Sequence, residues 1–316
     1  MSLVVTGATG QLGRAVVESL LERGVPAADI TATGRSTEKL ADLAARGVTI
    51  VAADYKDPAS LDTAFAGADK VLLVSSNDFD DRAGQHRNAI DAAQRAGVGH
   101  VVYTSGPRAT TSSMLLMADH RATEEHLAAS GLTSTVLRNG WYVENYTPSV
   151  PTYLEHGMVG SAGDGRVSLA LRRELGEAAA AVLTGEGHEG QVYELGGEAV
   201  TLTELAAILS DATGATISYT DVPVETLRWI LVGAGLPEPL AAIFADVDLA
   251  IAAGELEVDP ADLAALLGRP ATPLPLPSRS PCPSERRRVD VVGREGRVAA
   301  RAATRLVPRR IGDSNP

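Results

Sequence analysis

Three glycines near the amino terminus constrain this chain more than any other feature. A short apolar run at residues 3–5 leads into Thr6-Gly7-Ala8-Thr9-Gly10-Gln11-Leu12-Gly13, and apolar residues then recur with helical spacing. Gly7 suits the tight exit from a strand, Gly10 lets a pyrophosphate approach the backbone, and Gly13 lets a helix pack closely on the strand. This order predicts a dinucleotide site at the start of the helix. The alternative is a glycine-rich surface turn.

Apolar runs alternate with helical patterns through the first 140 residues. We expect further strands near residues 30–33, 48–52, 71–74, 100–104 and 135–137, and helices at about 37–46, 81–96 and 117–129. Such alternation is typical of an α/β fold with a Rossmann-type, doubly wound parallel sheet. Its ligand crevice lies at the carboxyl ends of the strands.

The pattern divides the chain into three parts. We expect a dinucleotide-binding Rossmann domain over residues 1–140 and a smaller, mainly helical substrate or lid domain over residues 141–268, interleaved with the first. Its helices are expected near 177–184, 201–213, 224–234 and 238–253, with a strand at 191–195. Residues 269–316 are rich in arginine and proline, and this composition predicts a disordered basic tail.

Charge separates the tail from the rest of the chain. Residues 269–316 hold 11 arginines and 4 acidic residues, for a net charge of +7, whereas residues 1–268 carry −19 of the total of −12. The acidic balance argues against a nucleic-acid partner. Two hypotheses remain for the tail, an out-of-frame reading of a GC-rich gene and a functional basic arm centred on Arg286-Arg287-Arg288.

Composition also indicates the kind of protein. The single cysteine, Cys282, excludes an intrachain disulfide framework and a cysteine-built metal site, and it suits the cytoplasm. No run approaches the ~20 apolar residues of a membrane span. No secretory signal is visible at the amino terminus. We therefore expect a cytoplasmic protein without a metal site.

The residue after the second expected strand decides between NAD and NADP. Arg35 stands there with no Asp or Glu beside it, and a cation at this point can hold the 2′-phosphate of NADPH. The alternative is a solvated surface arginine. Asp54 ends the third strand, where it can accept the adenine amino group or simply cap the turn before Pro58.

Polar side chains follow the fourth and fifth strands. Ser75, Ser76 and Asn77 are expected near the pyrophosphate and nicotinamide ribose, although an ordinary turn has the same composition. Tyr103 lies where hydride-transfer enzymes of this architecture place catalytic hydroxyls. The usual Tyr-x-x-x-Lys pair is absent between residues 112 and 130. His120 is the candidate proton donor there, and the alternative is a solvated histidine on a charged helix.

The segment after the sixth strand is rich in aromatic and amide side chains. Four of the twelve aromatic residues lie between positions 141 and 153, around the block Asn139-Gly140-Trp141-Tyr142-Val143-Glu144-Asn145. Planar rings suit a wall for the nicotinamide and for a flat acceptor, which we assign to Trp141, Tyr142 and Asn145. The other interpretation is a core anchor between domains.

Together these motifs resemble those of a known family. With Gln85-His86-Arg87-Asn88, Tyr103-Thr104-Ser105 and Gly187-His188-Glu189-Gly190, the chain is similar to NADPH:quinone oxidoreductase type 2 proteins over about residues 2–274. These are atypical short-chain dehydrogenases of NmrA-like type, with triphenylmethane reductases as near relatives. The resemblance implies cofactor contacts at residues 7–12, 75–77 and 139–144, at Arg35 and at Arg172. It also implies that the missing Tyr-Lys pair is normal.

The resemblance implies direct hydride transfer from NADPH to a quinone or a similar planar, electron-poor acceptor, without flavin or metal. Two alternatives remain, a non-catalytic NADP(H) sensor of NmrA type and a reductase of other planar acceptors such as triphenylmethane dyes. The expected partner is the small-molecule acceptor, and a homodimer is one assembly to test.

Overall fold

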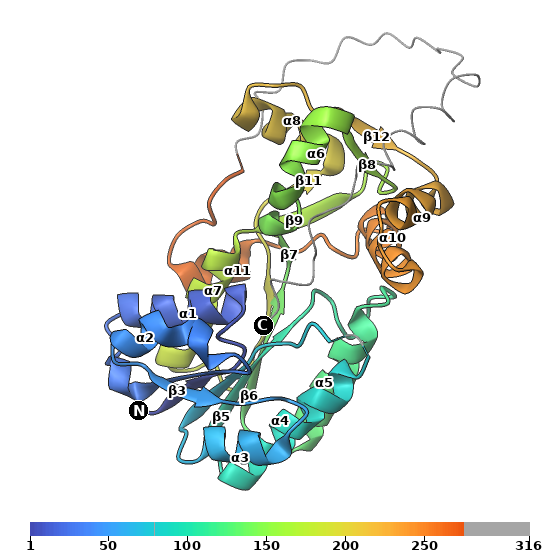
Figure 1. Cartoon of the computed structure of the whole chain (residues 1–316). Helices are drawn as coiled ribbons and strands as arrows, with labels where there is room; N and C mark the ends of the chain where they lie inside the picture. Colours follow the sequence, from blue (N-terminus) through green and yellow to red (C-terminus); the bar gives the residue numbers. More distant parts are fainter. Residues whose placement is uncertain (79, 275–316) are drawn as a thin grey trace, which may run out of the picture.

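A seven-stranded parallel sheet forms the centre of the molecule (Figure 1). The computed structural model describes residues 1–78 and 80–274. The strands of the sheet are β1 (Leu3–Val5), β2 (Ile30–Gly34), β3 (Thr49–Ala52), β4 (Lys70–Leu73), β5 (His100–Ser105), β6 (Ser134–Asn139) and β10 (Val192–Leu195). They run in the order β10-β6-β5-β4-β1-β2-β3. The chain reverses direction between β1 and β4, which places the crevice of a Rossmann-type fold at their carboxyl ends and confirms the predicted fold class.

Helices cover both faces of this sheet. One face carries α1 (Gln11–Glu22), α7 (Arg172–Thr184) and α11 (Ala261–Leu267), and the other carries α3 (Pro58–Phe65), α4 (Arg82–Ala96) and α5 (Met117–Ala129). Leu3 and Val5 pack into the first layer, whereas Val4 packs into the second. Burial on both faces explains why the central strands β1 and β4 are almost continuously apolar. The helix expected at 37–46 is a 3₁₀ turn (Thr37–Leu40) followed by α2 (Ala41–Ala45).

A smaller part with its own apolar core lies beyond the carboxyl edge of the sheet (Figure 1). Its strands are β7 (Trp141–Tyr142), β9 (Arg166–Ala170) and β11 (Ala199–Thr201) in one sheet, and β8 (Met158–Gly160) with β12 (Tyr219–Asp221) in another. Its helices are α6 (Val150–His156), α8 (Leu202–Thr213), α9 (Val224–Gly233) and α10 (Glu238–Ala252). This part is helical as expected, with five short strands that the sequence did not indicate.

Two boundaries differ from the sequence prediction. The strand placed among the helices of the smaller part is β10, which pairs in parallel with β6 and completes the main sheet. Residues 269–274, assigned to the tail, pack on the body. Arg269 forms an ion pair with Glu174 at 2.6 Å, and Thr272 donates to the same carboxylate. The remainder of the predicted tail, residues 275–316, lies outside the described residues.

No helix within residues 1–78 and 80–274 has the length and apolar character needed to cross a membrane.

Candidate functional site

The turn from β1 into α1 has the geometry of a phosphate loop. Gly7 has φ +60°, and the N–H of Gly10 donates back to its carbonyl at 2.9 Å. A Cβ on Gly13 would lie 2.4 Å from the same carbonyl, so only glycine fits there. Among the described residues no side chain caps the first turn of α1, and no acidic residue lies in that turn. Its amides are therefore free to bind an anion.

Ala8, Thr9 and Leu12 of this motif differ in the groups that they offer to a cofactor. Ala8 and Leu12 are buried in the core, so only their backbone atoms can contact a cofactor. Oγ1 of Thr9 is buried and has no hydrogen-bond partner among the described residues. A Cβ on Gly34 would lie 2.6 Å from Cγ2 of Thr9, so β2 approaches the loop closely through a glycine.

The ends of β2 and β3 present Arg35 and Asp54. Arg35 is exposed, and no hydrogen bond or ion pair joins it to another residue of the described ranges. A cation free of a carboxylate at this point suits a 2′-phosphate. Asp54 accepts the backbone N–H of Lys56 at 3.0 Å, so it does cap its own turn. Its contact with adenine stays a prediction.

Hydrogen bonds from α4 hold the segment that follows β4. The N–H of Ser76 donates to Nε2 of His86 at 2.9 Å, and its hydroxyl donates to Oε1 of Gln85 at 3.0 Å. The N–H of Ser75 donates to Oγ1 of Thr104 at 2.9 Å. These contacts fix the backbone of the Ser75-Ser76-Asn77 segment at the edge of the crevice.

His86 is neutral, with its ring proton on Nδ1. Because Nε2 accepts from Ser76, Nδ1 donates to Oγ1 of Thr123 at 2.9 Å, and that hydroxyl donates to the carbonyl of Asp119. Burial, together with the charge of the nearby Arg82 guanidinium, lowers the pKa of His86 to about 3. The imidazole therefore works as a fixed hydrogen-bonding strut between the β4 segment and α5.

Tyr103 and His120 form a second buried pair. The Tyr103 hydroxyl lies 2.7 Å from Nδ1 of His120, and Tyr103 is fully buried while His120 is 7% exposed. Burial lowers the pKa of His120 and raises that of Tyr103. The alternative of a solvated His120 is therefore wrong. The Tyr103 hydroxyl faces His120 in the core below the crevice, and its direct contact with a cofactor stays a prediction.

The aromatic block connects the smaller part to the phosphate loop. The guanidinium of Arg172, at the start of α7, lies 4.6 Å from the centre of the Tyr142 ring and donates to Oε1 of Gln11. Glu144 accepts the backbone N–H of Arg172 at 3.1 Å. Tyr142 and Glu144, which the sequence placed at one site with Arg172, thus both contact that arginine.

The other members of the block differ in exposure. Oδ1 of Asn139 is buried without a hydrogen-bond partner in the described part of the chain. Gly140 approaches β10 so closely that a Cβ would lie 2.8 Å from the carbonyl oxygen of Leu195. Trp141 is half-buried against the core of the smaller part, and Asn145 is exposed. Both interpretations of Trp141, acceptor wall and anchor, agree with this position.

Comparison with known proteins gives this site a context. The NmrA-like family matches residues 1–262. The chain belongs to the NmrA-like family. Quinone oxidoreductase 2 of Escherichia coli (strain K12) is 46% identical to this NmrA-like chain over 274 residues, which cover 86% of this chain and 96% of that protein.

Solved structures agree with this family assignment. The crystal structure of an NADPH-dependent quinone oxidoreductase from Escherichia coli, complexed with NADPH, superposes on this NmrA-like chain with a TM-score of 0.83 and 46% identity, over 86% of this chain and 96% of that one. Citrobacter triphenylmethane reductase complexed with NADP(H) gives a TM-score of 0.81 and 40% identity, over 86% and 97%. The transcriptional regulator NmrA, 16% identical with a TM-score of 0.68, shares the fold.

Two contacts of this NmrA-like site are not predictable from the motifs alone. Gln85 and His86 belong to the family motif Gln85-His86-Arg87-Asn88, and in the structure they hold the Ser76 segment. Gln11 and Arg172 are each expected at the cofactor site, and in the structure they also contact each other. The signal available for the Ser76 contacts was a pair of hydrogen-bonding side chains, Gln85 and His86, near the start of the helix that follows a polar strand end. The contact of Gln11 with Arg172 joins residues 161 positions apart, for which the sequence carries no signal.

Proposed function

We propose that this chain is an NADPH-dependent oxidoreductase that transfers hydride directly to a quinone or a similar planar, electron-poor acceptor. The observation that carries the proposal is the contact of the Trp141-Tyr142 block with the phosphate loop through Arg172, in a chain 46% identical to a quinone oxidoreductase. A cofactor held by the loop and an acceptor held by the block would then be neighbours.

The described residues fit NADPH. The uncapped amides of α1 and the free Arg35 suit its phosphates, and the buried, unpartnered Oγ1 of Thr9 and Oδ1 of Asn139 each need a hydrogen-bonding partner. Bound NADPH supplies the hydride. The loop built on Gly7, Gly10 and Gly13 would hold the pyrophosphate through its backbone amides. Arg35 would hold the 2′-phosphate, and Ser75 to Asn77 with Asn139 the nicotinamide riboside.

The chain's own residues mainly position the two reactants. A quinone accepts hydride readily, because its product is aromatic, and its oxygens can take protons from water or from a weak donor. His120 on α5 is the candidate donor by its position, with its Cδ2 3.5 Å from where a Cβ on Gly106 would stand. Burial lowers its pKa and favours the neutral form, which is a weak acid, so we expect water to supply most of the protons. Trp141 and Tyr142 would stack on the acceptor and exclude water.

Oxidation of NADPH with 1,4-benzoquinone, measured beside NADPH affinity, tests this proposal. We expect saturable turnover with quinone and tight NADPH binding. Tight binding without turnover for quinones or dyes would favour a sensor. Faster turnover with a cationic triphenylmethane dye than with benzoquinone would reassign the acceptor, an outcome to which the Citrobacter reductase gives weight.

The remaining expectations concern assembly and location. We propose a homodimer in the cytoplasm that does not bind nucleic acid. Light scattering after size-exclusion chromatography tests for the homodimer. A filter-binding assay with duplex DNA at physiological salt tests for nucleic-acid binding.

A further inference from the structure

A second pocket lies at the edge of the sheet opposite the crevice. It has a volume of about 470 Å³ and lies at the amino ends of β4 and β5, beside the loop that precedes β10. Its lining residues are Ala68, Asp69, Lys70, Gly97, Gly99, His100, Thr133 and Glu189. Glu189 belongs to the Gly187-His188-Glu189-Gly190 motif, for which the proposed redox site has no use.

The hydrogen bonds of His100 leave one ring nitrogen as a bare acceptor. Thr135 Oγ1 donates to the carbonyl of His188 at 2.5 Å, so at 2.8 Å from Nε2 of His100 it can only accept. Nε2 therefore carries the proton. Burial and the Lys70 charge lower the pKa of His100, so Nδ1 is unprotonated. His100 is 4% exposed, and Nδ1 has no hydrogen-bond partner within the described residues.

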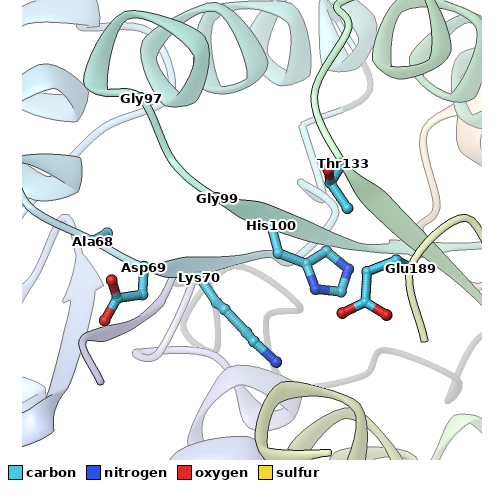
Figure 2. A pocket seen from close by; sticks show the side chains of 8 residues that line it. All are labelled: Ala68, Asp69, Lys70, Gly97, Gly99, His100, Thr133 and Glu189. Atoms are coloured by element: carbon cyan, nitrogen blue, oxygen red, sulfur yellow. The ribbon is translucent and has the colours of Figure 1, made fainter. Parts of the chain in front are cut away.

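Groups of opposite charge flank this acceptor. Figure 2 shows the Lys70 ammonium and the Glu189 carboxylate extending from two sides into the space below the ring of His100. Lys70 Nζ donates to the carbonyl of Gly185 at 3.2 Å, and no ion pair joins it to Glu189 in the part of the chain that the structure describes. The Asp69 carboxylate already accepts the N–H of Ser2 at 2.7 Å. Among the described residues, the pocket thus presents a cation without an ion-pair partner, an exposed carboxylate and a buried acceptor without a donor.

We propose that this pocket binds a small zwitterion of the α-amino acid class. Its carboxylate pairs with Lys70, and its ammonium donates to Nδ1 of His100 and to Glu189. A simple anion would leave Nδ1 without a donor and the Glu189 charge without a cation, and a simple amine would leave the Lys70 charge without an anion. A divalent cation is disfavoured by the ammonium of Lys70. The volume accommodates glycine with space for a side chain.

Calorimetric titration of the full chain with glycine tests this proposal. We expect saturable binding with a Kd on the order of 1 mM or tighter. Acetate and methylammonium should each bind at least about tenfold more weakly, because each satisfies only part of the pocket. The ¹⁵N resonance of His100 Nδ1 should shift as glycine is added, because Nδ1 then accepts a hydrogen bond.

Two exposed residues of one loop provide a matched pair of variants. Glu189→Gln should weaken glycine binding about tenfold or more, and Glu186→Gln, which lies outside the pocket lining, should leave it unchanged. Quinone reduction should be the same in both, so failure here is separate from failure of the redox proposal. Absence of saturable glycine binding, acetate binding as tight as glycine, or equal affinity of the two variants would each overturn the assignment.

Discussion

The carboxylate of Glu144 accepts the backbone N–H of Arg172 through both of its oxygens, each at 3.1 Å. This contact caps the first turn of α7 with a residue 28 positions earlier in the chain, because the preceding Leu171 has no side chain that can do so. It also places the Arg172 side chain between Tyr142 and Gln11. The helix end and the two halves of the site therefore depend on the same carboxylate.

Replacing this carboxylate separates its two effects. Glu144→Ala should lower the free energy of unfolding by about 0.5–2 kcal/mol, as loss of a helix cap does, and should also weaken NADPH binding. Glu144→Gln keeps one acceptor oxygen and should lose less on both counts. Urea unfolding and NADPH titration measure these effects. Equal losses in the two variants would mean that charge, rather than the hydrogen bond, is what α7 requires.

Arg35 should decide the choice of cofactor. Because it is the free cation at the end of β2, Arg35→Ala should raise KM for NADPH by about tenfold or more and leave NADH nearly unchanged. Arg87→Ala, at an exposed arginine on α4, is the control and should change neither. Equal increases in KM for NADPH and NADH would show that Arg35 does not bind the 2′-phosphate.

Trp141 should act on the acceptor more than on the cofactor. Trp141→Ala should reduce kcat/KM for quinone by more than it reduces NADPH affinity, because a stacked flat acceptor loses its platform. Trp229 lies on α9 and is 77% exposed, so Trp229→Ala controls for the loss of a large aromatic side chain. A collapse of NADPH binding in the first variant would instead identify Trp141 as an anchor between the two parts.

The main sheet was predictable because its signal is local. The central strands β1, β4 and β5 are buried on both faces, so they stand out as short, mostly apolar runs, and the glycines of the phosphate loop are set by contacts within the loop itself. The run at residues 191–195 predicted the strand β10, but it did not predict which sheet β10 joins. Val192 and its neighbours form a strand in either sheet, and only the pairing with β6 decides.

The polar side of α5 misled the sequence analysis for a physical reason. Glu124 is buried although it is charged, because Arg138 pairs with it at 2.6 Å and Ser105 donates to it at 2.6 Å. His120, one turn earlier, is buried through its contact with Tyr103. These partners come from β5 and β6, so a count of charges along the helix indicates a solvated face where there is a polar interior.

The buried His120 can be tested as a proton donor. His120→Ala should keep at least a third of the quinone reductase activity, because water can protonate the product. His120→Gln, which keeps hydrogen-bonding capacity in the core, should be at least as active and more stable. A loss of about a hundredfold in both variants, with folding intact, would make His120 the donor.

His86 should make the protein sensitive to acid. Its pKa is about 3 in the folded chain, because burial disfavours the imidazolium, whereas an unperturbed histidine titrates near 6.5. Between these values the unfolded chain binds a proton that the folded chain does not. The stability that neutral His86 contributes is therefore full above about pH 6.5 and falls as the pH drops toward 3, by up to ~1.4 kcal/mol per pH unit.

A variant that cannot titrate in this range isolates that contribution. His86→Gln can still accept from the N–H of Ser76 through its amide oxygen, but it takes up no proton as the pH falls. Between pH 6.5 and pH 5 the wild type should lose up to about 2 kcal/mol more of its unfolding free energy than this variant does, measured by urea denaturation at each pH. His120 remains in both proteins, so its own titration cancels in the comparison. Parallel stability curves would mean that His86 takes up its proton at the same pH in the folded and unfolded chains, and the protonated Nε2 could then no longer accept from Ser76.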